Sequence, residues 1–416
     1  MLPHTLDDSP PSFDLLLTVR QEHEMEYTQS TLTPAEAEIL VRQLKPISID
    51  QVGTDGWKEQ RMSIEQLNMC SHSNAALKKD DFVRSFMIEH EKLPILLHEL
   101  LVIEVWRRRI LSSVEDEIIA NPSAAYLYTY YEAVILNFFE CMMYFEESVT
   151  AIGDDILELI DYCWRQVSGY CGNNFSIVSR IEEPADPKSP EDAKTNFKRQ
   201  QFQQEATRAM TSISCLWFVV ERISSLSMAV SNNILLKNDL VLGFAEVMTQ
   251  QIWLRRGPGK VQKYVQGQFR EVPMDDVMRI CVPEAHSWFI LHKLLCDRDC
   301  RSKYTYTAPK KEIILRIKRH LNETVVDQIP ALADVQRGLE ELSFLEPPSG
   351  TEEKFKSTLI IEQVARLMGS IDNSQRNWSA IEREMLKRLS NPESRQKDAM
   401  VLAKVFDAMF DLSREE

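Results

Sequence analysis

Helical stretches with apolar residues on one face recur along most of the chain, separated by short breaks. The segment 33–36, TPAE, begins the first stretch with an N-cap hydroxyl, a proline at the first helical position and a glutamate three residues after the cap. One face of this helix then carries Ala37, Leu40, Val41 and Leu44. Pro46 follows this apolar face, so we expect the helix to end just before that residue.

The same periodicity predicts a long series of further helices, and we find no alternation of strands with helices. The expected helices cover about 57–69, 75–90, 94–111, 122–147, 153–170, 200–231, 234–254, 275–297, 309–329, 331–345, 357–371, 376–390 and 392–412. Helices that are apolar over much of their circumference and joined by short loops are typical of stacked helical repeats, because each pair buries its faces only against its neighbours. We therefore predict an all-α fold, an armadillo/HEAT-like helical solenoid.

Proline-rich and charged segments divide this helical pattern. We expect a disordered acidic tail at 1–32, an N-terminal helical-repeat block at 33–180, a flexible charged insertion at 181–199, a second helical block at 200–345, a linker at 346–356 and a C-terminal helical segment at 357–413. Within the second block, the segment 253–273 holds a Gly-Pro-Gly break and a second turn candidate at Gly267. A small β-hairpin near 261–272 is an open alternative there.

The composition agrees with a helical chain and disfavours polyanionic partners. Only 12 of 416 residues are glycine, which disfavours β-sandwiches, barrels and glycine-rich nucleotide loops. The net charge of −15 repels nucleic-acid phosphate and anionic lipid, so we expect no nucleic-acid partner. Eight scattered cysteines, behind a start with neither a basic nor an apolar leader, are typical of reduced thiols in the cytosol.

The strongly apolar stretch 124–145 is long enough for a membrane span. It contains Glu132, Asn137 and Glu140. Each carboxylate near the middle of a span would cost about 2.5 to 3.5 kcal/mol, which offsets several apolar contributions. We therefore expect a helix buried inside the helical array and no membrane span.

No motif for catalysis, nucleotide binding or metal binding is complete. The sequence 257–260, GPGK, lacks the glycine spacing and the Ser or Thr of a phosphate loop, so we expect a turn. His292, Cys296 and Cys300 would share one face if their helix continued, but the chain has no CxxC pair to complete a zinc site. Motifs of hydrolases and deaminases are missing as well. We predict a non-enzymatic protein with no catalytic, cofactor-binding or metal-binding residues, and a site hidden from sequence patterns remains as an alternative.

Three local patterns have a structural and a functional interpretation. The basic clusters at 107–109 and at 310–320 are either ordinary charged outer faces or docking sites for an acidic partner. In the second cluster, Ile313, Ile314 and Ile317 form the apolar stripe. The pattern 53–57, GTDGW, predicts a tight turn that buries the Trp57 indole beneath the first helix pair, with a partner-binding tryptophan as the alternative.

Long segments of the chain resemble a known family. The segment 36–69, EAEILVRQLKPISIDQVGTDGWKEQRMSIEQLNM, closely resembles the N-terminal part of the zinc finger MYND domain-containing protein 10 family of axonemal dynein arm assembly factors. The likeness continues at 91–108, 154–167, 253–272, 302–332 and 377–386. It thus extends from Pro34 to about Leu412.

The resemblance implies a cytoplasmic scaffold or co-chaperone adaptor that helps axonemal dynein chains to fold and preassemble for motile cilia. The implied partners are dynein chains as clients, a leucine-rich-repeat assembly factor, heat-shock chaperones and an immunophilin-type prolyl isomerase. Centriolar satellites and dynein assembly particles are the alternative locations within the cytoplasm. A general interaction adaptor in transcriptional or centrosomal recruitment is the alternative function.

The sequence departs from this family at one point. Family members typically carry a MYND finger, a Cys/His module that binds two zinc ions, directly after the last helices. Such cysteines do not follow these helices here. Truncation and loss of the module in this lineage are both open, so no zinc ligand is transferred to any residue.

The first helix provides a test of the predicted apolar face. Val41→Gly removes a buried side chain and adds a glycine inside a helix, so we expect a loss of about 2 to 4 kcal/mol in the free energy of unfolding. Thermal denaturation measures it. An unchanged melting temperature would show that this helix is peripheral.

Overall fold

A computed structural model describes residues 31–172, 193–344 and 366–411 of the chain. The predicted linker at 346–356 and most of the predicted tail at 1–32 lie outside these ranges, as does 181–192 of the predicted insertion. The described part is 76% helical with one small sheet, which confirms the predicted all-α class.

The first block contains nine α-helices within residues 31–172. They are α2 (Pro34–Gln43), α3 (Asp55–Ala76), α4 (Phe82–Glu89), α5 (Leu93–Arg109), α6 (Glu115–Ile119), α7 (Pro122–Thr129), α8 (Tyr131–Met143), α9 (Glu146–Ala151) and α10 (Ile156–Gly172). The predicted start of α2 is confirmed as a capping box, because Thr33 Oγ1 accepts from Glu36 N and the Glu36 carboxylate accepts from Thr33 N. Val41 is completely buried.

The second block combines helices with a small sheet. Its elements are α12 (Ala193–Glu221), α13 (Met228–Asn232), a π-helical turn (Asn233–Lys237), α14 (Leu240–Gln250), β1 (Leu254–Gly257), β2 (Lys260–Val265), β3 (Gln268–Glu271), α15 (Val282–Cys296), α16 (Arg298–Lys303), α17 (Ala308–Leu315), a 3-10 turn (Arg316–His320), α18 (Glu323–Gln328) and α19 (Leu332–Phe344). Helix α12 begins inside the range 181–199 that was predicted to be a flexible insertion. Its Phe197 side chain is 5% exposed, so packing extends the helix toward its N-terminus.

Several predicted helices are shorter or are divided in the structure. The range 122–147 forms two helices, α7 and α8, with a break at Tyr130. In the range 75–90, α3 ends at Ala76 and α4 begins only at Phe82. In the range 275–297, the α-helix begins only at Val282, after a 3-10 turn that ends at Asp276. Between Ala308 and Gln328, two helices flank a 3-10 turn. Apolar periodicity locates a buried face but does not detect such breaks, because packing continues across them.

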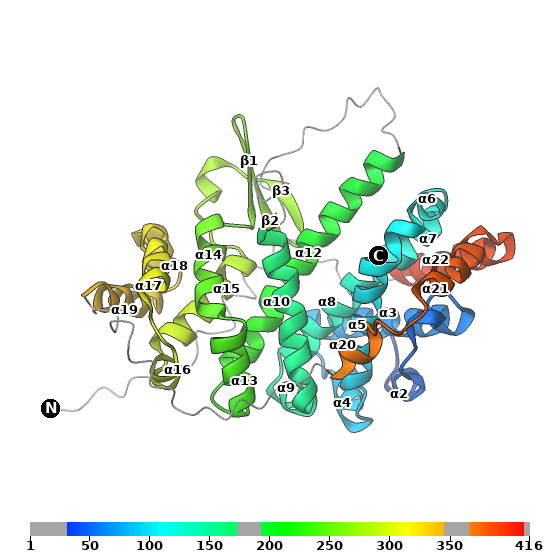
Figure 1. Ribbon diagram of the computed structural model, residues 1–416, viewed down its shortest axis with the longest axis horizontal. Helices are drawn as coiled ribbons and strands as arrows, with labels where there is room; N and C mark the ends of the chain where they lie inside the picture. The colour runs from blue at the N-terminus through cyan, green and yellow to red at the C-terminus, as the bar shows by residue number, and fades with distance from the viewer. Residues whose placement is uncertain (1–30, 173–192, 345–365, 412–416) are drawn as a thin grey trace.

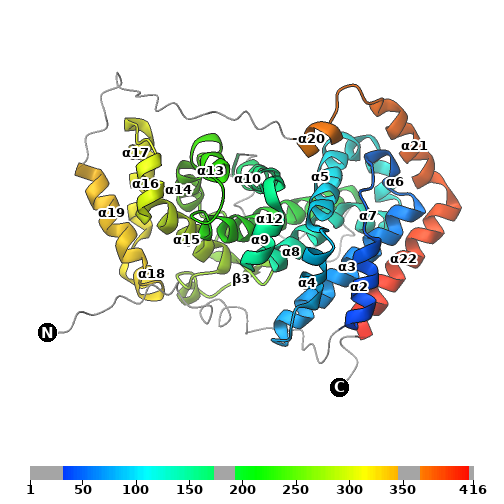
Figure 2. The same ribbon diagram turned by 90° about the horizontal axis from the view of Figure 1, so that it is seen from below.

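The helices form a row that is solenoid-like (Figure 1). Helices α17 to α19 lie at one end, α14 and α15 follow, α10 and α12 lie in the middle, and α5 and α3 lead to the other end. Figure 2 shows that the C-terminal helices α20 (Arg366–Ile371), α21 (Trp378–Ser390) and α22 (Pro392–Asp411) lie beside α5, α6, α7 and α3. The C-terminal segment therefore covers the first block and does not extend the row beyond α19.

Charged and polar contacts hold these C-terminal helices in place. Glu158 accepts from the backbone N–H groups of Leu367 and Met368, both at 2.7 Å, and so satisfies the start of α20. Buried Lys58 pairs with buried Asp398 of α22 at 2.7 Å. These partners are more than 200 residues apart in the sequence.

The small sheet confirms the hairpin predicted near 261–272 and adds a third strand. The order is β1-β2-β3, all antiparallel, with Gly257 opposite Lys260 and Val265 opposite Gln268. The sequence GPGK at 257–260 therefore forms the turn between β1 and β2, and Gly259 has a φ of +69°. Buried Lys263 lies 3.3 Å from Glu284 and donates to Val277 O, which attaches the sheet to the start of α15.

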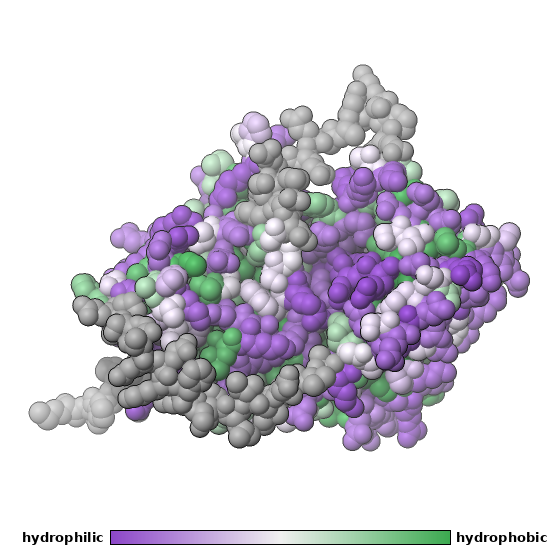
Figure 3. All heavy atoms as spheres, in the orientation of Figure 1, coloured by the Kyte–Doolittle hydropathy of each residue, from purple (hydrophilic) through white to green (hydrophobic). Residues whose placement is uncertain are grey.

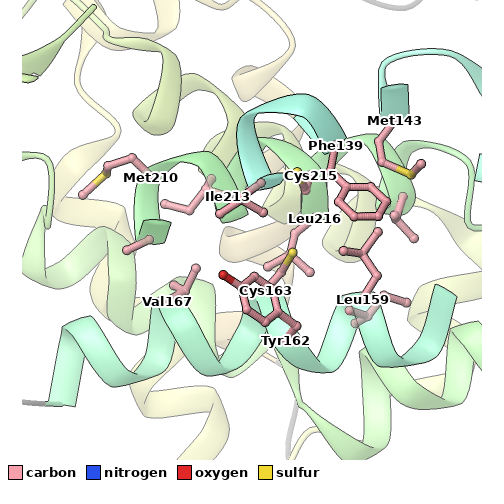
Figure 4. Packing of buried hydrophobic residues seen from close by; sticks show 14 of the residues in the cluster. Phe139, Met143, Leu159, Tyr162, Cys163, Val167, Met210, Ile213, Cys215 and Leu216 are labelled. Carbon is pink, nitrogen blue, oxygen red and sulfur yellow. The ribbon is translucent and has the colours of Figure 1, made fainter. Parts of the chain in front are cut away.

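The core continues through the middle of the row. Figure 4 shows Phe139 and Met143 of α8 facing Leu159, Cys163 and Val167 of α10 and Ile213 and Leu216 of α12. Each of these side chains is at most 1% exposed. The apolar stretch 124–145 is thus buried inside the protein. Within the described residues, no helix combines the length and apolar character that a membrane span needs.

An aromatic cluster fixes the turn before α3. Trp57 stacks on Tyr128 at 5.0 Å between ring centroids and meets Tyr131 edge-on at 5.4 Å, and its side chain is 1% exposed. This burial confirms the structural interpretation of GTDGW. Gly53 lies in the left-handed region with a φ of +85°, and a Cβ there would lie 2.6 Å from Tyr128 Oη. The turn therefore requires glycine at position 53.

Two neighbouring glycines provide a matched test. We expect Gly53→Ala to lower the free energy of unfolding by about 1 to 3 kcal/mol, because of its positive φ and the contact with Tyr128. Gly56→Ala places its methyl in open space at the start of α3, so we expect no loss of stability. Urea denaturation of both variants measures the difference. Equal stability of the two variants would contradict the role of Tyr128.

A candidate binding site around a buried carboxylate

A single buried carboxylate joins four helices at the middle of the row. Glu132 of α8 is 1% exposed. It accepts from Arg107 Nε of α5 at 2.6 Å and from Tyr162 Oη of α10 at 2.9 Å. Arg208 Nε of α12 lies 3.7 Å from the same carboxylate. Glu132, one of the polar residues that argue against a membrane span, therefore lies at the centre of an ionic network.

Burial and the neighbouring charges act in opposite directions on the pKa of Glu132. Burial by itself raises the pKa of a carboxyl, but the guanidinium groups of Arg107 and Arg208 outweigh it and lower the pKa to about 2. Arg107 makes two hydrogen bonds to Glu132, and its pKa rises although burial opposes this. Arg208 is farther away, and burial together with the charge of Arg107 lowers its pKa.

A second ion pair lies beside the first. Arg165 of α10 binds Glu104 of α5 through two bonds, from Nε at 3.0 Å and from Nη2 at 2.7 Å. Gln166 links the two pairs, because its Nε2 donates to Glu104 and its Oε1 accepts from Arg208 Nε at 3.3 Å. The fork of a guanidinium matches a carboxylate in this way, so the Arg107–Glu132 pair fixes the distance between α5 and α8, and the Arg165–Glu104 pair fixes the distance between α5 and α10.

These side chains surround a cavity of about 420 Å³ between α5, α10 and α12. We call it the arginine cavity and define it by Glu104, Arg107, Arg108, Arg165, Gln166 and Arg208. Arg208 lies at its base with a side chain 2% exposed, whereas Arg107, Arg165 and Arg108 are 21%, 37% and 45% exposed. Hydrophilic residues gather in this central part of the face (Figure 3). The size is within the range of small-molecule sites.

The structure separates the other residues that the sequence singled out. Helix α15 ends at Cys296 and Asp297 caps α16, so Cys300 does not continue the face of His292 and Cys296. In the described ranges, no group of three or more His, Cys, Asp or Glu residues is placed to hold a metal ion. All eight cysteines lie in the described ranges, and none of them forms a disulfide there.

The basic cluster at 310–320 is largely satisfied within the chain. Ile314 and Ile317 are fully buried, as the stripe predicted, and Ile313 is half-buried. Lys310 pairs with Asp239 at 2.7 Å, and Lys311 donates to Ser343 O. The structural interpretation therefore accounts for this cluster.

The cluster at 107–109 differs between its members. Arg107 is committed to Glu132, whereas Arg108 and Arg109 both pair with Asp372 in the loop after α20, at 3.7 and 2.9 Å. Sequence patterns did not identify Arg165 and Arg208 as site residues. The sequence did contain one indication of such partners, the glutamate Glu132 in the middle of an apolar stretch. A buried carboxylate needs cationic partners from other elements.

The fold and this site define an all-α protein of solenoid-like architecture with a charged interior network. The chain is 25% identical to "Zinc finger MYND domain-containing protein 10 homolog" of Drosophila melanogaster over 339 residues, which are 80% of this chain and 72% of that protein. This similarity confirms the resemblance found in the sequence. No family model and no solved structure matches the chain.

Neutralising Glu132 tests the network. Glu132→Gln leaves the half-buried Arg107 and the buried Arg208 guanidinium groups without their carboxylate, so we expect a loss of about 3 to 5 kcal/mol in the free energy of unfolding at pH 7. Guanidinium chloride denaturation measures it. The matched control is Glu384→Gln, at a side chain 51% exposed, for which we expect a change within about 0.5 kcal/mol. A similar small change in both variants would contradict the network.

The pH dependence has a defined sign. A carboxyl whose pKa falls from 4.5 to about 2 on folding stabilises the folded state by about 3 kcal/mol above pH 4.5. This stabilisation is lost as the pH falls from 4.5 to 2, because the unfolded chain binds the proton first. We expect denaturation curves of Glu132→Gln to lack this part of the acid destabilisation. If the stability of Glu132→Gln falls between pH 4.5 and 2 as much as that of the wild type, other groups cause the acid destabilisation.

Proposed function

We propose that this protein is a non-enzymatic scaffold, a co-chaperone adaptor in the folding and preassembly of axonemal dynein arms for motile cilia. The single observation that carries the proposal is the similarity over 80% of the chain to the Drosophila homolog of zinc finger MYND domain-containing protein 10. The resemblance covers both helical blocks and the C-terminal helices.

The architecture supports a binding role. A row of stacked helices presents a long surface, and such surfaces suit extended protein partners. The chain between β3 and α15 adds two flexible apolar side chains, since Met274 and Met278 are 71% and 43% exposed. Methionine adapts to partners of varied shape. We propose that dynein chains contact this outer surface while they fold.

The proposed partners follow from the resemblance. Besides axonemal dynein chains as clients, they are a leucine-rich-repeat assembly factor, heat-shock chaperones and an immunophilin-type prolyl isomerase, all acting in the cytoplasm. In this proposal the chaperones perform the steps that require ATP. The scaffold holds the client close to them, which raises the local concentration of both.

Removal of the gene tests the proposal. In cells with motile cilia, we expect electron micrographs of the axoneme to show the loss of outer and inner dynein arms, with recovery when the wild-type gene is returned. Affinity purification of the tagged protein should recover dynein heavy chains and chaperones. Intact dynein arms in the deleted cells would overturn the proposal. Recovery of nuclear corepressors in place of dynein chains would favour the recruitment adaptor.

A further inference from the structure

The base of the arginine cavity holds more positive charge than its partners neutralise. Arg107 and Arg208 share one carboxylate, Glu132, and Arg107 occupies both of its oxygens. Arg208 is 1% exposed, and its Nη1 atom has no hydrogen-bond partner. A buried donor on a charged group is costly to leave without an acceptor, because it has lost its water. The buried Arg208 guanidinium therefore needs a further acceptor.

Two further arginines that line the cavity keep unused donors. Arg165 binds Glu104 through Nε and Nη2, and Arg107 uses Nε and Nη2 for Glu132 and Gln166. The hydrogen bonds of the described residues leave Nη1 unused on both. The cavity thus combines one buried and two partly exposed guanidinium groups that each keep donors to spare. Guanidinium donors of this kind are typical of phosphate recognition.

The acidic residues of the cavity limit the size of the ligand. Glu104 is neutralised by its two bonds to Arg165, whereas Glu205 lines the cavity as well and is half-buried. The chain as a whole carries a net charge of −15. An extended polyanion such as a nucleic acid or an anionic membrane would meet this repulsion over a wide area. A small anion inside a recess meets little of it, because salt screens charges beyond about 8 Å.

We propose that the arginine cavity binds the phosphate group of a small, soluble phosphorylated molecule, with Arg208 at its base and Arg107, Arg165 and Arg108 around it. A carboxylate has two oxygens and fills the fork of one arginine. A phosphate group has more oxygens in a tetrahedral arrangement and can accept from several forks at once. The lowered pKa of Arg208, caused first by burial, agrees with a cation that lacks a sufficient counter-charge.

Titration calorimetry of the whole protein tests the proposal with two probes, inorganic pyrophosphate and glycerol 3-phosphate. We expect binding of one molecule per chain with a dissociation constant below about 1 mM, and at least tenfold weaker binding of the dicarboxylate glutarate. The tighter probe tells whether the site takes adjacent phosphates or a single phosphate ester. Absence of binding for both probes, or equal affinity for glutarate, would overturn the proposal.

Neighbouring arginines provide matched variants. Arg108 lines the cavity and Arg109 does not, yet both pair with Asp372 and their side chains are 45% and 48% exposed. We expect Arg108→Gln to weaken binding of the better probe about three- to tenfold and Arg109→Gln to leave it unchanged.

Arg165→Lys keeps a charge beside Glu104 but removes the fork, and we expect binding of the better probe to weaken about tenfold. Circular dichroism confirms folding. An equal loss in Arg108→Gln and Arg109→Gln would show binding by general charge and overturn the assignment.

Discussion

The carboxylate of Glu132 sets the arrangement of the helices at the middle of this protein. A charged group that is 1% exposed is tolerated only where cationic and hydroxyl partners surround it. Those partners come from α5, α10 and α12, so these helices must pack around α8 at fixed distances. Because α12 begins the second block, the same carboxylate also connects the two blocks. The apolar side chains around it stabilise the packing, and the ionic network fixes the distances between the helices that it joins.

The arginine cavity is a consequence of the same network. Two cations share one carboxylate, which leaves donors directed into a recess of about 420 Å³. Apolar packing alone would have closed this space, since protein interiors are close-packed. The cavity is lined by α5, α10 and α12, whereas Met274 and Met278, which we propose as part of the client surface, lie between β3 and α15. A scaffold of this kind therefore offers two different kinds of site, an extended surface for proteins and a recess for a small anion.

The C-terminal helices do not follow the linear order of the repeat pattern. The sequence orders the helices as one series, but α20, α21 and α22 cover the first block. Arg388 donates to the backbone oxygens of Asp50 and Val52, at 2.9 and 2.8 Å, and Lys58 pairs with Asp398. The turn that contains Gly53 is therefore held from two sides, by Tyr128 and by α21. The segment 36–69, which closely resembles the family, thus includes the turn and the helix α3 that α21 and α22 contact.

Local sequence patterns established the helical class, the capping box at Thr33 and the apolar face of α2. They also favoured the burial of Trp57 and allowed a hairpin near 261–272. Helical periodicity, capping and turn chemistry involve residues close in the chain, so the sequence reports them. The sequence indicated that Trp57 is buried, but not that Tyr128 and Tyr131 surround it. The packing of distant helices sets which partners Glu132 has, the pairing of Arg108 and Arg109 with Asp372, and the position of an unpaired Arg208 donor at the cavity. These features join residues from distant helices, and a charged residue in one sequence carries no mark of its distant partner.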